Sequence, residues 1–194
     1  MLYSYFVEKL VRQSFDHVNN HRWDELLKPV APNVHHRFAG SHSIGGERHD
    51  KATMRRWLER LGRVLPNLHL KVNRIWVTGW PWDTTVFVQW DATATLLNGD
   101  NSYFNRGLHV INMRWGRVYA LDVFEDSQEV ARGLAAQAAA GLNEAVAGQI
   151  CELASALLQG SDPSYASRRL QPNPRLQVTG ALVFRGTLNS EPRG

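Results

Sequence analysis

Asp91 and His109 are the two residues of this sequence best suited to acid–base chemistry. Asp91 interrupts the otherwise neutral, alternating run 85–97, and His109 belongs to the next run along the chain. A carboxylate on an apolar cavity wall has a raised pKa and can act as a general acid or base. An imidazole with a pKa of about 6.5 can donate or accept a proton at neutral pH. The Asn98-Gly99 turn predicts a hairpin joining the two runs, so we expect both residues on one cavity wall.

Both residues also have an inert interpretation. Asp91 shares one side of its strand with Phe87 and Gln89, and that side can equally meet water, as one face of an antiparallel sheet often does. His109 can be a core imidazole that is hydrogen-bonded to a neighbouring strand. Which interpretation holds depends on the face that each strand turns towards the core.

Four histidines, at positions 35, 36, 42 and 49, lie within fifteen residues and suggest a metal site. Their spacing matches no known ligand template, so no metal and no other cofactor is predicted. Instead we expect His35 or His36 to face the cavity, with His42 and His49 on a glycine-rich rim.

Composition excludes several classes of protein. The net charge of +4 arises from 22 basic and 18 acidic residues that are interleaved along the chain, which does not indicate a nucleic-acid partner. No run approaches the roughly 20 apolar residues that cross a bilayer, so neither a membrane span nor a signal peptide is predicted and a cytoplasmic location is expected. Cys151 is the single cysteine, which excludes a disulfide within the chain.

Hydrophobic periodicity places these residues in an α+β domain. Helices are predicted over 3–20, 23–27, 50–65 and from 126 into the alanine-rich stretch, and strands over 35–39, 68–78, 85–97, 103–114 and 117–125. The four long strands predict a strongly curved antiparallel meander packed on N-terminal helices, with a bulge at 73–74. The domain is expected to span residues 1–140. A C-terminal extension, 141–194, is expected to carry a helix over 142–158, a candidate edge strand over 176–184 and a loose tail.

The order of these elements resembles the nuclear transport factor 2-like superfamily, and within it the SnoaL-like, polyketide cyclase-like proteins. The phrases that carry the resemblance are Val30-Ala31-Pro32-Asn33-Val34-His35, Gly45-Gly46-Glu47-Arg48, Gly107-Leu108-His109-Val110-Ile111 and Trp115-Gly116-Arg117-Val118. The resemblance implies a cone-shaped fold around a pocket for a small hydrophobic molecule, and a homodimer formed through the sheet.

The resemblance extends to single positions. His109 matches the histidine that a SnoaL-like cyclase uses, whereas the aspartate place falls on Val123, one residue beyond Asp122. Asp91 falls where epoxide hydrolases of this fold hold an aspartate in an Arg-x-Asp pair, but the arginine place is taken by Gln89.

Three functional hypotheses follow. The first is cofactor-independent acid–base catalysis, of the cyclase or isomerase type, on a hydrophobic carbonyl or polyketide-like compound. The second is a non-catalytic ligand-binding or dimerisation module, and the third, least supported, is an epoxide hydrolase. The candidate catalytic residues are Asp91, His109 and Asp122, and the candidate ligand-binding residues are His35, Phe38, Trp57, Phe87, Gln89, Asn105 and Val123.

Overall fold

The computed structural model describes residues 2–151 and confirms the α+β class. In chain order its elements are α1 (Leu2–Asn19), α2 (Trp23–Leu27), β1 (Val30–Phe38), β2 (Gly46–Arg48), α3 (Lys51–Val64), β3 (His69–Trp80), β4 (Asp83–Ala94), β5 (Tyr103–Arg114), β6 (Arg117–Glu125), α4 (Ser127–Ala139) and the 3₁₀ turn η1 (Asn143–Val146). Within these residues no helix is long and apolar enough to span a membrane.

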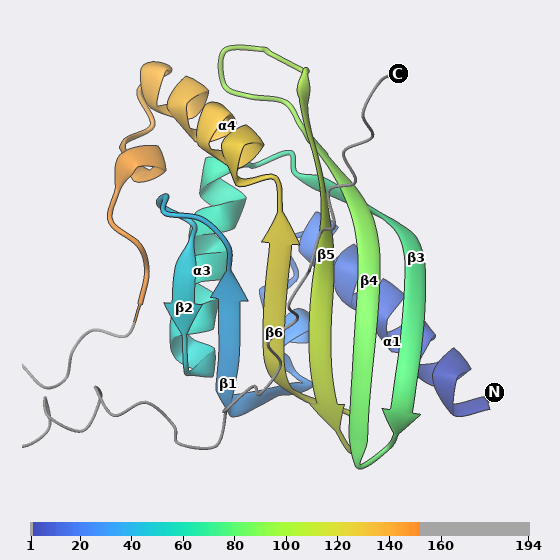
Figure 1. Ribbon diagram of the computed structural model, residues 1–194. Coiled ribbons are helices and arrows are strands. Elements are labelled where there is room, and N and C mark those ends of the chain that lie inside the picture. The colour runs from blue at the N-terminus through green and yellow to red at the C-terminus, as the bar shows by residue number, and fades with distance from the viewer. Residues whose placement is uncertain (1, 152–194) are drawn as a thin grey trace, which may run out of the picture. The chain divides into compact units, whose positions relative to one another are not determined.

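The six strands form one curved, open sheet in the order β2-β1-β6-β5-β4-β3. Strands β3 to β6 are the predicted antiparallel meander, whereas β1 runs parallel to β6 and carries the short edge strand β2. Helices α1 and α3 both lie behind the sheet in Figure 1, α1 against β3 and α3 against β1. The concave face of the sheet and these helices therefore enclose the core.

Local sequence signals explain where the elements begin and bend. The Asp50 carboxylate accepts hydrogen bonds from the backbone N–H of Thr53, at 2.7 Å, and from its hydroxyl, and so caps α3. The Asp126 carboxylate caps α4 in the same way. The β3–β4 register shifts between Val72 and Arg74, as the break in alternation predicts.

The predicted helix over 142–158 is wrong in its described part. Residues 143–146 form a single 3₁₀ turn, and residues 147–151 are irregular. Their carbonyls are bound by side chains instead of by a helix: Arg60 donates to the Gly148 oxygen at 2.6 Å, and Arg48 donates to that of Ile150 at 3.0 Å. The described part of the extension therefore packs on the domain. Residues 152–158 and the predicted strand over 176–184 lie outside the described residues.

Replacing the α3 cap tests the capping interaction. Asp50→Ala leaves the Thr53 N–H without its acceptor, so we expect a loss of about 1 kcal/mol in unfolding free energy, measured by urea denaturation. Asp83→Ala, at an exposed position, is the control. Equal midpoints for the two variants would contradict the assignment of Asp50 as a stabilising cap.

Candidate functional site

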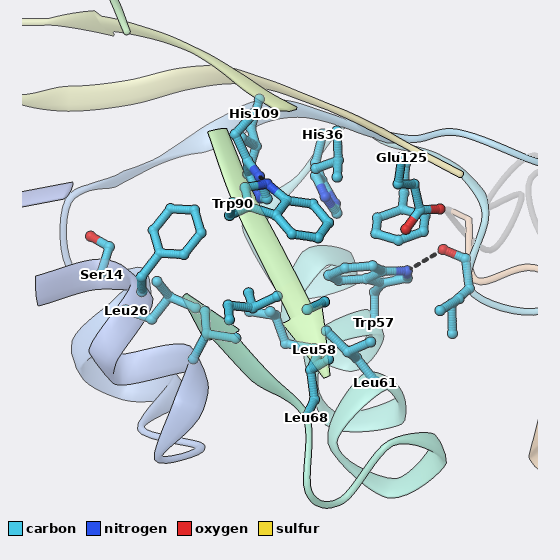
Figure 2. Close-up of a pocket in the computed structure, with 18 of the residues that line it drawn as sticks. Ser14, Leu26, His36, Trp57, Leu58, Leu61, Leu68, Trp90, His109 and Glu125 are labelled. Carbon is cyan, nitrogen blue, oxygen red and sulfur yellow. Dashed lines mark hydrogen bonds between the residues drawn. The ribbon is translucent and has the colours of Figure 1, made fainter. Parts of the chain in front are cut away.

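A cavity of about 120 Å³ lies between the concave face of the sheet and the helices. Its lining is almost entirely apolar and includes Phe15, Leu26, Leu58, Leu61, Leu68 and Ile111. In the same lining, the Trp57 indole is held by a hydrogen bond to the Ile44 carbonyl at 2.7 Å, drawn as the dashed line in Figure 2. Such a surface favours apolar ligands.

Four ionisable side chains interrupt this apolar lining, and all come from the sheet: His36, Tyr103, His109 and Glu125. Figure 2 shows His109, His36 and Glu125 along one wall, opposite Leu58, Leu61 and Leu68. They belong to β5, β1 and β6, which are adjacent in the sheet. A ligand in the cavity would therefore meet polar groups on the sheet side and aliphatic carbon on the helix side.

His109 is held as a neutral imidazole with one defined tautomer. The Trp90 indole N–H donates to His109 Nδ1, which leaves the proton on Nε2. Gly107 makes this contact possible, because a Cβ there would lie 2.3 Å from the Trp90 ring. Burial lowers the pKa of His109 to about 3, so its expected pKa near the ordinary value is wrong. At neutral pH the ring offers an N–H donor and no positive charge.

His36 is also neutral and is almost completely buried, with 1% of its surface exposed. Burial, and then the positive charge of Arg48, hold the pKa of His36 well below its ordinary value. The Arg48 guanidinium lies 3.4 Å from His36 Nδ1 and can only donate, so Nδ1 accepts and Nε2 carries the proton. The Arg48 side chain in turn lies over Trp57 and donates to the Gly45 carbonyl.

Glu125 is the residue of the cavity that sequence reasoning missed. Its side chain is 3% exposed, and burial, followed by the nearby charge of Asp126, raises the pKa of its carboxyl group to about 9. Within the described chain its Oε1 atom has no hydrogen-bond partner. A signal was present: Glu125 is two residues beyond Val123 and so lies on the same side of β6.

His42 lies directly behind Glu125. Its Nε2 atom is 3.9 Å from Glu125 Oε1, and neither of its ring nitrogens has a hydrogen-bond partner among residues 2–151. Burial, followed by the charge of Arg48, lowers the pKa of His42. An unpartnered buried carboxyl beside an unpartnered imidazole is costly for folding alone, and is the arrangement expected where protons are moved.

Five residues of the predicted site lie on the cavity wall: Phe38, Trp57, Asn105, His109 and Val123. Val123 is the direct cross-strand neighbour of both His109 and Phe38. Asn105 already uses its amide, because it accepts from the Asp126 N–H and donates to the Asp126 carbonyl, both at 3.1 Å. Asn105 therefore fixes the chain just after Glu125.

The prediction that Asp91 lines the cavity is wrong, and so are the predictions for Phe87 and Gln89. The other side of β4, carrying Val88 and Trp90, is the buried side, because burying apolar groups stabilises the fold and burying unpaired polar groups costs free energy. On the outer face Asp91 lies opposite Lys71 of β3 and Arg106 of β5 in the strand register. The pairing of Asp91 with His109 on one wall therefore fails.

Asp122 and His35 also lie outside the cavity. Asp122 is paired with Val110 across β5–β6, and the register shift in that pair falls at 112–113, too far away to turn Asp122 inwards. His35 alternates with His36 on β1, so it faces outwards, where its Nε2 atom is 3.3 Å from Glu47 Oε2. Successive side chains of a strand point to opposite faces of the sheet, and this alternation explains why Asp122 and His35 lie outside the cavity.

Known proteins share this architecture. A family model described as a SnoaL-like domain matches residues 11–121. PrhC from Penicillium brasilianum has a TM-score of 0.58 at 13% identity, covering 68% of this chain and 87% of that chain. An NTF2-like protein of unknown function from Burkholderia pseudomallei has a TM-score of 0.55 at 19% identity, covering 64% of this chain and 94% of that chain. TerC, co-crystallised with polyporic acid, has a TM-score of 0.53 at 18% identity, covering 62% of this chain and 91% of that chain. The comparison with curated proteins finds no match.

The buried carboxyl group predicts a specific pH dependence of stability. The pKa of Glu125 is about 9 in the folded chain, whereas an unfolded glutamate ionises at about 4.3. Between these values only the folded state keeps the proton, so the contribution of Glu125 to stability is largest at low pH and is lost as pH rises, by at most about 1.4 kcal/mol per pH unit. Glutamine does not ionise, so Glu125→Gln removes this pH-dependent loss of stability. The Tm of the variant relative to the unsubstituted chain should therefore rise steadily from about pH 4 to about pH 8.

Glu25→Gln, at an exposed position of α2, is the matched control. A Tm difference for Glu125→Gln that stays constant across this range would show that Glu125 titrates like an exposed carboxyl group.

Proposed function

Because the chain belongs to the SnoaL-like domain family, we propose that its cavity binds a small, largely apolar carbonyl compound and catalyses proton transfer on it without a cofactor. The reaction would be of the cyclase or isomerase type. The observation that carries this proposal is the Glu125 carboxyl group, which is buried in an apolar cavity with one oxygen unpartnered and an imidazole behind it.

The polar groups of the wall favour one class of ligand. At neutral pH His109 and His36 each carry a proton on Nε2, and no hydrogen bond from either Nε2 atom is found within the described chain. These donors suit an uncharged acceptor such as a carbonyl oxygen, whereas an anionic ligand would lose its hydration without gaining a cation on this wall. Comparable cavities of about 150 Å³ hold benzene, which favours a compact ligand of about one ring.

The geometry supports a proton-transfer route through Glu125. Once Glu125 has lost its proton to solvent as pH rises, its carboxylate, which has His42 Nε2 3.9 Å away, removes a proton from the carbon next to the carbonyl group. The electron pair of that C–H bond moves onto the carbonyl oxygen, which His109 and His36 stabilise through their N–H groups. Returning the proton to a different carbon isomerises the compound, and attack by the enolate carbon on a second carbonyl closes a ring.

One observation favours a non-catalytic alternative. The position that carries the aspartate in SnoaL-like cyclases is Val123, which lines the cavity with an apolar side chain. In this alternative the cavity holds a ligand without changing it, and Glu125 only binds an oxygen atom of that ligand. An epoxide hydrolase has no support, because Gln89 and Asp91 lie on the outer face.

We also propose a homodimer formed through the outer face of the sheet. That face exposes Trp76, Phe104 and Phe124, with 40%, 43% and 46% of their surfaces accessible. Exposed aromatic side chains on one face of a sheet favour an interaction site there, because aromatic residues are enriched at protein interfaces. Phe124→Glu should give a monomer by light scattering, and Trp115→Glu, in the β5–β6 turn, should not. An unchanged mass for Phe124→Glu would place the interface elsewhere.

Hydrogen–deuterium exchange at the methyl group of acetophenone, a one-ring ketone, tests catalysis directly. We expect the protein to accelerate exchange in D₂O, measured by proton NMR, and the rate to rise from about pH 6 to about pH 9 as Glu125 ionises. Glu125→Gln should abolish this rise, and His109→Phe should slow exchange by roughly 100-fold because one donor to the enolate oxygen is lost. Asp91→Asn, on the outer face, is the matched carboxylate control and should keep the full rate.

Binding and catalysis are separated by also measuring acetophenone affinity through the fluorescence of the cavity tryptophans. Binding without acceleration above the Glu125→Gln rate would support the non-catalytic alternative. Absence of both would overturn the proposed ligand class.

A further inference from the structure

A second group of chemically capable side chains lies on the outer face of the sheet, away from the cavity. We propose that His35, Glu47 and His49 form a binding site for a divalent transition metal of the zinc class. The β1–β2 register pairs His36 with Arg48 and Arg37 with Glu47, and continuing it places His35 opposite His49. The three side chains therefore share one side of a two-stranded edge, and one ligand atom from each lies within 4.8 Å of the others.

The spacing of the ligand atoms is close to what a metal ion requires. Glu47 Oε2 lies 3.3 Å from His35 Nε2 and 3.8 Å from His49 Nε2. Two atoms bound tetrahedrally at about 2.0–2.1 Å are about 3.3 Å apart. Of the three pairs, the Glu47–His35 pair already fits, and side-chain movement must bring the His49 nitrogen closer to both other atoms, which all lie within 4.8 Å of one another. The two imidazole rings are stacked, with centroids 4.8 Å apart and planes 2° apart, so both lie beside Glu47 on one face. Because an imidazole binds a metal in the plane of its ring, the two rings must tilt towards each other to share one ion.

The donor set selects the class of metal. Two imidazole nitrogens and one carboxylate oxygen suit Zn²⁺, Co²⁺, Ni²⁺ or Cu²⁺, whereas Mg²⁺ and Ca²⁺ prefer oxygen ligands alone. Arg37 is the fourth member of this face, and its Nε atom lies 3.8 Å from Glu47 Oε1. Arg37 thus forms an ion pair with one carboxylate oxygen of Glu47, and the other, Oε2, is the oxygen that lies near the two histidines.

Such a metal would act as a clamp on the edge of the sheet. β2 is only three residues long, and its Arg48 lies between Glu47 and His49 but reaches the interior, where it contacts His36 and the Gly45 carbonyl. Linking residues 47 and 49 to His35 would fix the strand that carries Arg48. The site is chemically independent of the proposed carbonyl chemistry.

Zinc titration of the full chain, without a purification tag, tests the proposal by isothermal calorimetry. The experiments use a Cys151→Ser background, because the exposed Cys151 thiol is itself a zinc ligand. We expect one saturable site per chain, with affinity lowered roughly ten-fold or more in His35→Ala, His49→Ala and Glu47→Gln. His69→Ala, which removes an exposed histidine from β3, should bind zinc unchanged.

Two further measurements make the result decisive. Co²⁺ should give visible absorption bands that are lost in the same three variants, and Zn²⁺ should raise the Tm of the chain but not of those variants, while Mg²⁺ should do neither. Circular dichroism establishes that each variant is folded before titration. Absence of saturable zinc binding, or binding retained in the folded His35→Ala/His49→Ala double variant, would overturn the proposal.

Discussion

Burial of the Glu125 carboxyl group against an apolar lining determines what the cavity can do chemically. Water is excluded from the end of β6, so the charged form of the carboxyl is disfavoured and its pKa rises to about 9. The same exclusion of water lowers the pKa of His109 to about 3. The wall formed by Glu125, His109 and His36 is therefore uncharged at neutral pH. An uncharged wall of hydrogen-bond donors is compatible with an apolar ligand, and a charged wall would not be.

This desolvated wall depends on contacts from several distant parts of the chain. Arg48 is fully buried and joins His36 of β1 to the Gly45 loop and to the Ile150 carbonyl. Residues beyond α4 thus take part in holding Arg48 in place. Trp90 fixes the other histidine, because its indole passes over Gly107 and donates a hydrogen bond to His109. The polar groups that face the cavity are fixed by partners that are themselves packed in the core.

The sequence predicted the framework well because hydrophobic periodicity records burial directly. The limits of β5 and β6, the cap of α3 and the bulge in β3 were all visible in the residue pattern. What the pattern did not settle was which polar residues enter the core. Asp91 was chosen because it interrupts a neutral run, yet its strand buries the strictly apolar side. Strand parity would have pointed to Glu125, which lies on the same side of β6 as Val123, but a carboxylate buried without a partner runs against the usual cost of burial.

The C-terminal extension shows a second limit of periodicity. The spacing of apolar residues after Gly141 indicates a helix, but residues 147–151 are held in an irregular path by Arg60 and Arg48. These arginines are distant in the sequence, so no local pattern reveals their effect. Tertiary hydrogen bonds have replaced the helical ones.

The proposed function requires the cavity wall to present neutral hydrogen-bond donors to a carbonyl oxygen in an otherwise apolar site. The infrared stretching frequency of the carbonyl group of ¹³C-labelled acetophenone, bound to the protein at neutral pH, measures this directly. Hydrogen bonds from His109, His36 or Glu125 predict a frequency well below that of the same ketone in hexane, and a return towards the hexane value in the Glu125→Ala/His109→Phe double variant. A bound ketone with the hexane frequency in the unsubstituted protein would contradict this requirement, because the wall would then contact the ligand without donating a hydrogen bond to it.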